Sequence, residues 1–188
     1  IFNIYIISIF HFKDKDYINC KRKYLFSFMG GYDKRGYLTT IRERIFKMKD
    51  RDDIYIKNTG GWHFDSVVYS NDQNNKGVII KTDKNDKNKE NYNELLLNSR
   101  YSLCPSGSGP NSIRLWESLA IGTIPIILSD NLELPQHELW KDTIINIKES
   151  DLEDIYKILE NISIEKEEVM KENCIKIYNY FRDNYRIV

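Results

Sequence analysis

A glycine-rich loop followed by a short helix carries the side chains with the clearest chemistry in this chain. The apolar spacing after the loop predicts a helix that ends at Gly122. Arg114 and Glu117 lie three residues apart, hence on one side of that helix and near its first turn. Loop N–H groups and the positive end of a helix favour a bound anion, most often a phosphate. The loop residues are Ser106, Gly107, Ser108 and Gly109.

This pattern predicts a nucleoside diphosphate site. An arginine one turn into the helix can make a bidentate contact to a diphosphate, and a glutamate beside it can accept hydrogen bonds from ribose hydroxyls. Asn111 and Ser112 precede the helix as candidate caps of its free N–H groups, and Ser112 could add a phosphate contact. The alternative is that Arg114 and Glu117 form an exposed ion pair and the glycines only turn the chain.

The elements that must position this loop alternate between strand and helix. Apolar runs predict five strands, at 23–29, 53–57, 101–104, 123–128 and 143–147, with a further short strand at 78–80. Helices are predicted at 37–49, where Leu38 joins the inward face, at 94–98, and from Ile113, which is also expected to point inward. Two C-terminal helices follow, the first opened by a capping box at Ser150 and Glu153. The polar run at 82–93 is predicted as a solvated loop. Such alternation is typical of a Rossmann-like α/β fold with a mostly parallel sheet and helices on both faces.

Two further candidates follow earlier predicted strands. Arg35 lies in a polar loop at a strand's carboxyl end and is a second candidate for the diphosphate; the alternative is a solvated loop charge. His63 has the chemistry of a general base that Asp65 could orient, although a histidine between two aromatic residues also suits a packing role. Arg42 and Arg44, on the first predicted helix, are interpreted as surface charges.

Composition excludes several classes of function. Lys+Arg and Asp+Glu both number 28 and no basic stripe is present, so a nucleic-acid-binding surface is not expected. The three cysteines are too few and too dispersed for a disulfide framework or a zinc site and are predicted to be buried free thiols. No carboxylate pair resembles a metal motif. The chain begins with Ile1, so we expect a fragment or a processed form, and the apolar run at 1–12 is too short to span a bilayer.

The order and spacing of several short motifs match a known family. The matching residues are Leu103-Cys104-Pro105, Gly107, Ser112, Arg114, Trp116-Glu117-Ser118-Leu119, Gly122, Ile124-Pro125, Leu128-Ser129-Asp130 and Leu134-Pro135. Upstream, Lys23 to Phe28, Gly30, Arg35 and the helix that carries Arg42 add to the match. The chain resembles the C-terminal half of the exostosin-like glycosyltransferases, the GT47 family, over about 22–162.

The resemblance implies the donor-binding half of a GT-B glycosyltransferase. It implies a nucleoside diphosphate sugar as donor, with a UDP-sugar expected, and transfer with inversion to a hydroxyl of a glycan or protein acceptor without a metal or other cofactor. It divides the chain into an N-terminal segment at 1–22, a truncated linker or strand, and an exostosin-like nucleotide-sugar-binding domain at 23–188. Because few residues precede Lys23, we expect the family's N-terminal acceptor domain to lie elsewhere, in cis or on a partner chain. Family members are commonly anchored in Golgi membranes, yet no complete anchor is present here.

Two alternatives stay open at this point. Gly107-x-Gly109-x-x-Ser112 nearly matches the dinucleotide fingerprint, and Asp130 follows at about the expected distance, as in an NAD-dependent oxidoreductase. A serine in place of the third glycine and the late position of the loop count against it. The other alternative is an incomplete or degenerate copy that binds a nucleotide without transferring a sugar.

Overall fold

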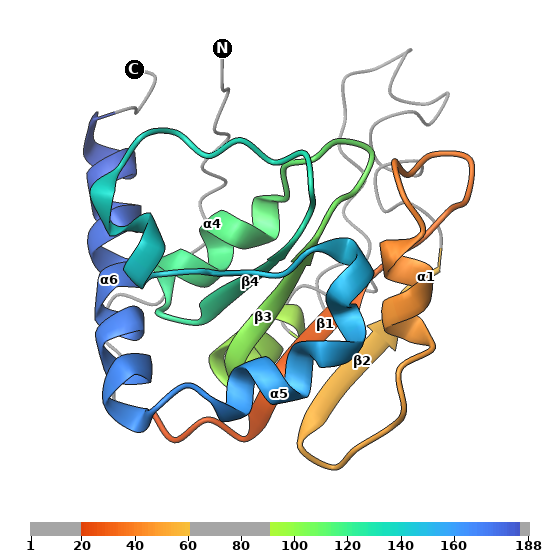
Figure 1. Ribbon diagram of the computed structural model, residues 1–188, viewed down its shortest axis with the longest axis horizontal. Helices are drawn as coiled ribbons and strands as arrows, with labels where there is room; N and C mark the ends of the chain where they lie inside the picture. The colour runs from red at the N-terminus through yellow and green to blue at the C-terminus, as the bar shows by residue number, and fades with distance from the viewer. Residues whose placement is uncertain (1–19, 61–90, 185–188) are drawn as a thin grey trace.

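The computed structural model describes residues 20–60 and 91–184. Within these ranges five strands form one sheet in which every pairing is parallel, in the order β2-β1-β3-β4-β5. The strands are β1 (Tyr24–Gly30), β2 (Ile54–Asn58), β3 (Ser99–Pro105), β4 (Ile124–Leu128) and β5 (Ile145–Asn146). The α-helices are α1 (Ile41–Phe46), α4 (Ile113–Ala120), α5 (Ile155–Glu160), α6 (Ile164–Asn184) and a helix at 91–97, and the 3₁₀-helices are η2 (Glu138–Asp142) and η3 (Glu149–Asp154). The Rossmann-like α/β prediction is confirmed (Figure 1).

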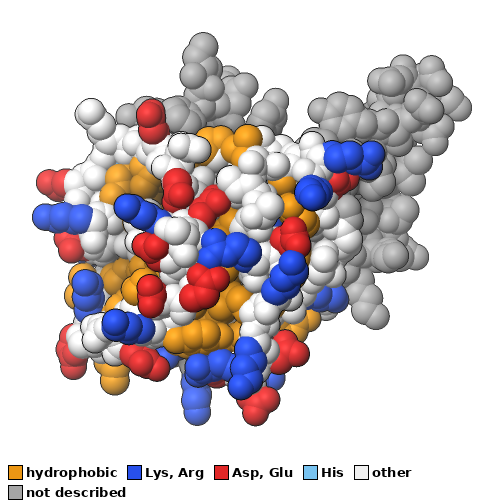
Figure 2. All heavy atoms as spheres, turned by 45° about the vertical axis from the view of Figure 1, so that its right-hand side comes forward, with side chains coloured by type: hydrophobic (Ala, Val, Ile, Leu, Met, Phe, Trp, Pro, Cys, Tyr) orange, Lys and Arg blue, Asp and Glu red, His pale blue; other side chains and the backbone are white. Residues whose placement is uncertain are grey.

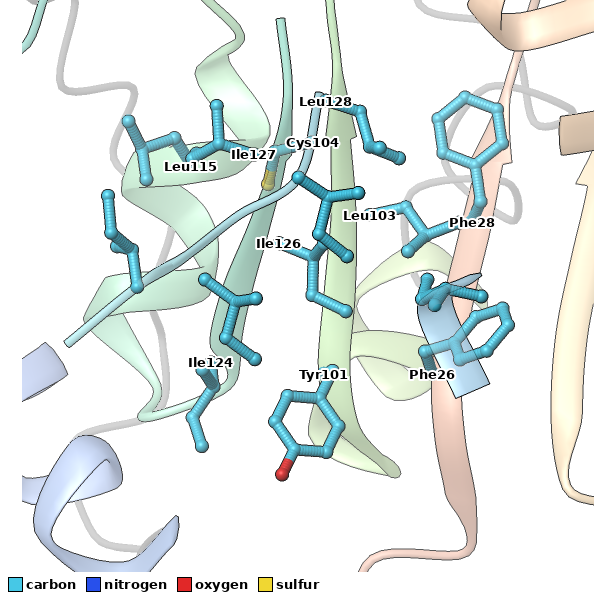
Figure 3. Close-up of a cluster of buried hydrophobic side chains, with 14 of the residues drawn as sticks. Phe26, Phe28, Tyr101, Leu103, Cys104, Leu115, Ile124, Ile126, Ile127 and Leu128 are labelled. Atoms are coloured by element: carbon cyan, nitrogen blue, oxygen red, sulfur yellow. The ribbon is translucent and has the colours of Figure 1, made fainter. Parts of the chain in front are cut away.

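Strand register divides the core into two layers. Phe26 pairs with Tyr101, which in turn pairs with Ile124, so these side chains share one face of the sheet. Cys104 and Ile127 are also register partners and lie on the opposite face, on the side of Leu115 from α4 (Figure 3). All five positions of β4 are buried, as expected for a parallel strand that is covered on both faces.

Helices cover both faces of the sheet. In Figure 1, α5 crosses in front of the strands and α4 lies behind them. Tyr156 of α5 packs on Phe26, with ring centroids 5.6 Å apart, and Phe46 of α1 packs on Phe28 at 5.5 Å. On the other side, α6 packs against α4, where Trp116 and Phe181 meet edge to face at 5.4 Å.

Several predicted boundaries were wrong. Helix α1 is shorter than predicted, because turns and bends occupy 34–40; its buried residues are Ile41 and Ile45, whereas Leu38 is 54% exposed. Ile113 is also 43% exposed, because α4 begins there at the sheet edge and buries the face that carries Leu115 and Leu119.

The C-terminal region also differs from the prediction in one detail. The capping box at Ser150 and Glu153 does not form, because a 3₁₀-helix starts one residue earlier and Glu153 pairs with Arg44 instead.

The end of α4 was predicted correctly: Gly122 follows the helix with φ of +66°, a left-handed conformation that glycine adopts without strain. Cys104 and Cys174 are buried free thiols as predicted, whereas Cys20 is exposed.

A buried carboxylate links the long C-terminal helix to the sheet. Glu167 of α6 is only 4% exposed and accepts hydrogen bonds from Arg100 Nε at 3.0 Å and from the Tyr101 hydroxyl at 3.0 Å. Burial alone would raise the pKa of Glu167, but the hydrogen-bonded ion pair with Arg100 lowers it below the usual 4.5. The folded state therefore favours the charged carboxylate.

We expect the contribution of Glu167 to stability to depend on pH. Because its pKa is lower in the folded state, the stabilisation is fully present above about pH 4.5 and is lost as the pH falls through the folded-state pKa. Glu167→Gln should lower the free energy of unfolding by about 1–2 kcal/mol at neutral pH, a modest value because solvent screens the partly exposed Arg100. Urea unfolding of both proteins from about pH 7 down to about pH 3 should show this difference shrinking. A difference that is independent of pH would contradict the role given to the charge.

Candidate functional site

The strand order creates a topological switch point at the carboxyl ends of β1 and β3. The chain leaves β1 towards β2 on one side and leaves β3 towards β4 on the other, so the connections diverge between these neighbouring strands. Open α/β sheets bind ligands at such a switch point. Gly30 is the last residue of β1 and Gly31 follows it, and Ser106 directly follows β3.

Arg114 reaches from the first turn of α4 to this switch point between β1 and β3. Its guanidinium donates hydrogen bonds to the carbonyl oxygens of Met29 and Leu103 and lies over the Phe28 ring, 4.4 Å from the centroid. None of the ion pairs among the described residues includes Arg114 or Glu117. The alternative in which these two residues form an exposed pair is therefore wrong.

Arg42 approaches the same switch point from α1. Its Nε donates to the Ser106 carbonyl at 2.8 Å and its Nη1 donates to the Gly31 carbonyl at 3.1 Å. The guanidinium carbon lies 4.7 Å from the centroid of the Tyr37 ring. The prediction of a surface charge was wrong for Arg42, because the helix is turned so that this half-buried side chain lies over the sheet edge. Arg44 instead forms a partly exposed ion pair with Glu153 at 2.6 Å.

The two guanidinium groups converge on Gly30. A Cβ atom placed on Gly30 would lie 3.3 Å from Arg114 Nη2 and 3.4 Å from Arg42 Nη1. Burial, and then repulsion from Arg114, lower the pKa of Arg42 to about 10. Neither arginine has a carboxylate partner among the described ion pairs. Two cations held together by carbonyl oxygens and aromatic rings form a site in which a bound anion would relieve their repulsion.

The glycine-rich loop supplies close packing to this site. Gly107 donates its N–H to the Gly109 carbonyl at 2.8 Å. This amide was predicted to bind a phosphate, but its hydrogen bond is made within the loop. A Cβ at Gly107 would lie 3.1 Å from Arg42 Nη2, which explains the glycine. Ser106 is buried, whereas Ser108 is exposed.

The residues before α4 lie next to its free N–H groups. Asn111 is exposed, and Ser112 occupies the N-cap position in an extended conformation without a side-chain cap hydrogen bond. The predicted capping by Ser112 is therefore absent. Its hydroxyl is not committed to the helix and stays a candidate for a phosphate contact.

Tyr92 is a site residue that sequence reasoning missed. Its hydroxyl donates to Glu117 Oε2 at 2.6 Å and accepts from Arg114 Nε at 3.3 Å. Burial raises the pKa of Tyr92 well above its usual 10, so the phenol remains a donor. The prediction of a solvated loop at 82–93 was wrong at its end, since a helix occupies 91–97. Tyr92 is the only aromatic residue between 82 and 98, and that was the available indication.

Of the two other predicted candidates, Arg35 is not brought to this site and His63 lies outside the described residues. The Arg35 side chain is 93% exposed and pairs with Asp33 at 3.8 Å within its own turn. His63 and Asp65 lie outside the described residues, as does the predicted strand at 78–80.

Sequence comparisons place this chain in a known family. The sequence model of the Exostosin GT47 domain matches residues 3–162. The chain belongs to the exostosin GT47 family. It is 28% identical to the Exostosin-1 homolog of Caenorhabditis elegans over 94% of this chain and 45% of the relative. Two Arabidopsis thaliana proteins are also similar: a probable glucuronoxylan glucuronosyltransferase (32% identity, 38% of this chain, 16% of the relative) and a probable beta-1,4-xylosyltransferase (31%, 53% and 24%). The chain thus spans less than half the length of these relatives.

Membership of the GT47 family favours the glycosyltransferase interpretation over the oxidoreductase one. Asp130, the candidate ribose ligand of a dinucleotide fold, accepts the Glu149 N–H at 2.9 Å. In the described part of the chain no group of three or more His, Cys, Asp or Glu side chains is arranged to hold a metal ion. No helix in 20–60 or 91–184 is both long and apolar enough to cross a membrane.

Proposed function

We propose that this GT47 chain is the donor-binding part of a glycosyltransferase. It binds a nucleoside diphosphate sugar, with a UDP-sugar as the expected donor, and the sugar passes to a hydroxyl of a glycan or protein acceptor with inversion. The observation that carries the proposal is the convergence of Arg42 and Arg114 on Gly30 at the switch point of the sheet. A diphosphate is the ligand whose charge and size suit two adjacent guanidinium groups.

The same groups would stabilise the leaving diphosphate. Negative charge develops on it as the glycosidic bond to the donor breaks, and donors already fixed in place stabilise that charge without reorganisation. Arg42 uses one N–H at Ser106 and one at Gly31, which leaves about three of the five guanidinium N–H groups for a ligand. Ser112 and the N-terminal N–H groups of α4 would complete the phosphate contacts.

Glu117 would bind the ribose. Tyr92 donates to one carboxylate oxygen, Oε2, and so fixes the orientation of the carboxylate. The other oxygen, Oε1, would accept a hydrogen bond from a ribose hydroxyl. This division of roles separates diphosphate recognition, by arginines, from nucleoside recognition, by a glutamate.

The rest of the transferase would come from outside the described site. We infer that residues 23–188 form the donor-binding unit and 1–22 a separate segment. The general base and the acceptor site would lie on an acceptor-binding domain, in the same protein or in a partner chain. A secretory-pathway location stays a prediction from the family.

The proposal predicts selective binding of nucleoside diphosphates. In calorimetric titrations of the purified chain, UDP or GDP should bind about tenfold or more tightly than the matching monophosphate, because the second phosphate engages a second guanidinium. Arg35→Ala should change this affinity less than about twofold, because its side chain lies in solvent.

Three other results would lead to different conclusions. Binding of NAD in preference to UDP and GDP would favour the oxidoreductase. No binding of any of these ligands would overturn the proposed donor site. Tight binding of a UDP-sugar with neither transfer nor hydrolysis, in a chain supplied with its acceptor-binding part, would support a degenerate copy.

A further inference from the structure

Ser106 joins three segments at the carboxyl edge of the sheet. Its carbonyl oxygen accepts the Nε–H of Arg42 at 2.8 Å, and its N–H donates to the Leu128 carbonyl oxygen at 3.0 Å. Its hydroxyl donates to Glu149 Oε1 at 2.9 Å and lies 3.0 Å from Thr39 Oγ1. The residue is only 3% exposed, so these contacts determine its conformation. The direction of the carbonyl that holds Arg42 therefore depends on what holds the hydroxyl.

Glu149 is well placed to hold that hydroxyl. It is the first residue of η3, directly after the β5 region, and its own backbone is anchored on both sides. Its N–H donates to Asp130 Oδ1 at 2.9 Å and its carbonyl oxygen accepts a hydrogen bond from Arg44. The carboxylate thus extends from a fixed origin towards Ser106.

We propose that Glu149 is a positioning residue that acts through Ser106 to orient the Arg42 guanidinium in the anion site. The inference rests on the proposed diphosphate site and goes beyond it, because it assigns a role to a residue that follows β5, whereas Arg42 lies on α1, which follows β1. Strands β3 and β4 separate β1 from β5 in the sheet. Without the Glu149 acceptor, Ser106 can rotate towards Thr39 alone, and the constraint on its carbonyl weakens. Arg42 then samples orientations in which its remaining N–H groups no longer converge with those of Arg114.

The role depends on hydrogen bonding and not on charge pairing. Glu149 takes part in none of the ion pairs among the described residues, and its contact with Ser106 uses a single acceptor oxygen. A glutamine carries an acceptor oxygen at the same position. Glu149→Gln should therefore preserve the positioning that Glu149→Ala removes.

Glu153 offers a matched control in the same 3₁₀-helix. Its carboxylate pairs with Arg44 on the surface and does not contact Ser106. Calorimetry with inorganic pyrophosphate, the part shared by all nucleoside diphosphates, should show binding weakened about fivefold or more by Glu149→Ala. Glu149→Gln and Glu153→Ala should each change it less than about twofold.

Coupling to Arg42 distinguishes positioning from a general structural effect. In an Arg42→Met background, Glu149→Ala should weaken pyrophosphate binding no further, because the group it orients is gone. NMR gives a test without ligand: hydrogen exchange of the Arg42 Nε–H, assigned by its loss in Arg42→Met, should be faster in Glu149→Ala than in the wild type or Glu149→Gln.

The outcomes separate this inference from the proposed function. If wild-type protein binds pyrophosphate and UDP but Glu149→Ala binds them equally well, or loses affinity additively with Arg42→Met, the positioning role is overturned and the donor site stands. If the wild type binds neither ligand, the donor site fails, and unchanged Nε–H exchange in Glu149→Ala would then overturn the positioning role as well. Faster Nε–H exchange in Glu149→Ala, together with wild-type exchange in Glu149→Gln, supports the positioning role in either case.

Discussion

Replacing Arg114 with methionine should weaken the binding of UDP by about tenfold to a hundredfold, the range expected for loss of a charge-assisted contact to a phosphate. Arg114 is the guanidinium that links α4 to the carboxyl end of β1, through the Met29 carbonyl and the Phe28 ring. Methionine keeps an unbranched apolar stem that can pack on the same ring. The loss should therefore reflect the missing donors, and titration calorimetry with UDP measures it directly.

Arg51→Met is the matched control for this substitution. Arg51 also lies over an aromatic ring, 4.4 Å from the centroid of Tyr156, but it precedes β2 at the amino edge of the sheet. Removing it should leave UDP affinity within about twofold of the wild type. Arg114→Lys should recover only part of the loss, because an ammonium cannot reproduce the planar fork that meets two acceptors at once. Equal losses in Arg114→Met and Arg51→Met would show that Arg114 does not contact the nucleotide.

The fold was predictable because its core strands have simple sequence patterns. The run Ile124 to Leu128 is apolar throughout, as expected for a strand covered on both faces, and Gly122 marks the end of the helix before it. Helix α1 was overextended because apolar spacing continues from Leu38 to Met48, although hydrogen bonds such as that from the Leu38 N–H to the Gly107 carbonyl hold the chain in turns before Ile41. Periodicity does not reveal where tertiary contacts delay the start of a helix.

The site was predictable only where its residues are close in sequence. Arg114 and Glu117 share a helix with the loop before it, so their common side followed from spacing. Arg42 and Tyr92 reach the same site from segments that are far away in the sequence. A lone charged or aromatic residue in a polar stretch does not indicate which residue it will contact. The contact of Glu117 with a tyrosine from another helix was not predicted for the same reason.

Gly30→Ala should weaken UDP binding about tenfold while leaving the fold nearly as stable as before. Position 30 does not have a positive φ, so alanine fits the backbone without strain. The added methyl group would lie 3.3 Å from Arg114 Nη2, 3.4 Å from Arg42 Nη1 and 3.2 Å from Phe28 Cζ. The contact with Arg114 Nη2 is tight enough to move that guanidinium group by a few tenths of an ångström, and the methyl group would also fill the space beside Arg42. A bidentate contact tolerates such a displacement poorly.

The combination of weak binding and retained stability is what identifies Gly30 as part of the site. Chemical unfolding should give a free energy within about 1 kcal/mol of the wild type, and calorimetry with UDP should give the affinity loss. Gly36→Ala serves as the control, because a Cβ at that exposed position in the loop after β1 would meet no atom of the described residues within 4 Å, apart from its chain neighbours. Unchanged affinity in Gly30→Ala would mean that the nucleotide does not use the point where the two arginines meet. A large loss of stability would instead mean that glycine is required there for packing, and the convergence of Arg42 and Arg114 would have to be explained by the fold alone.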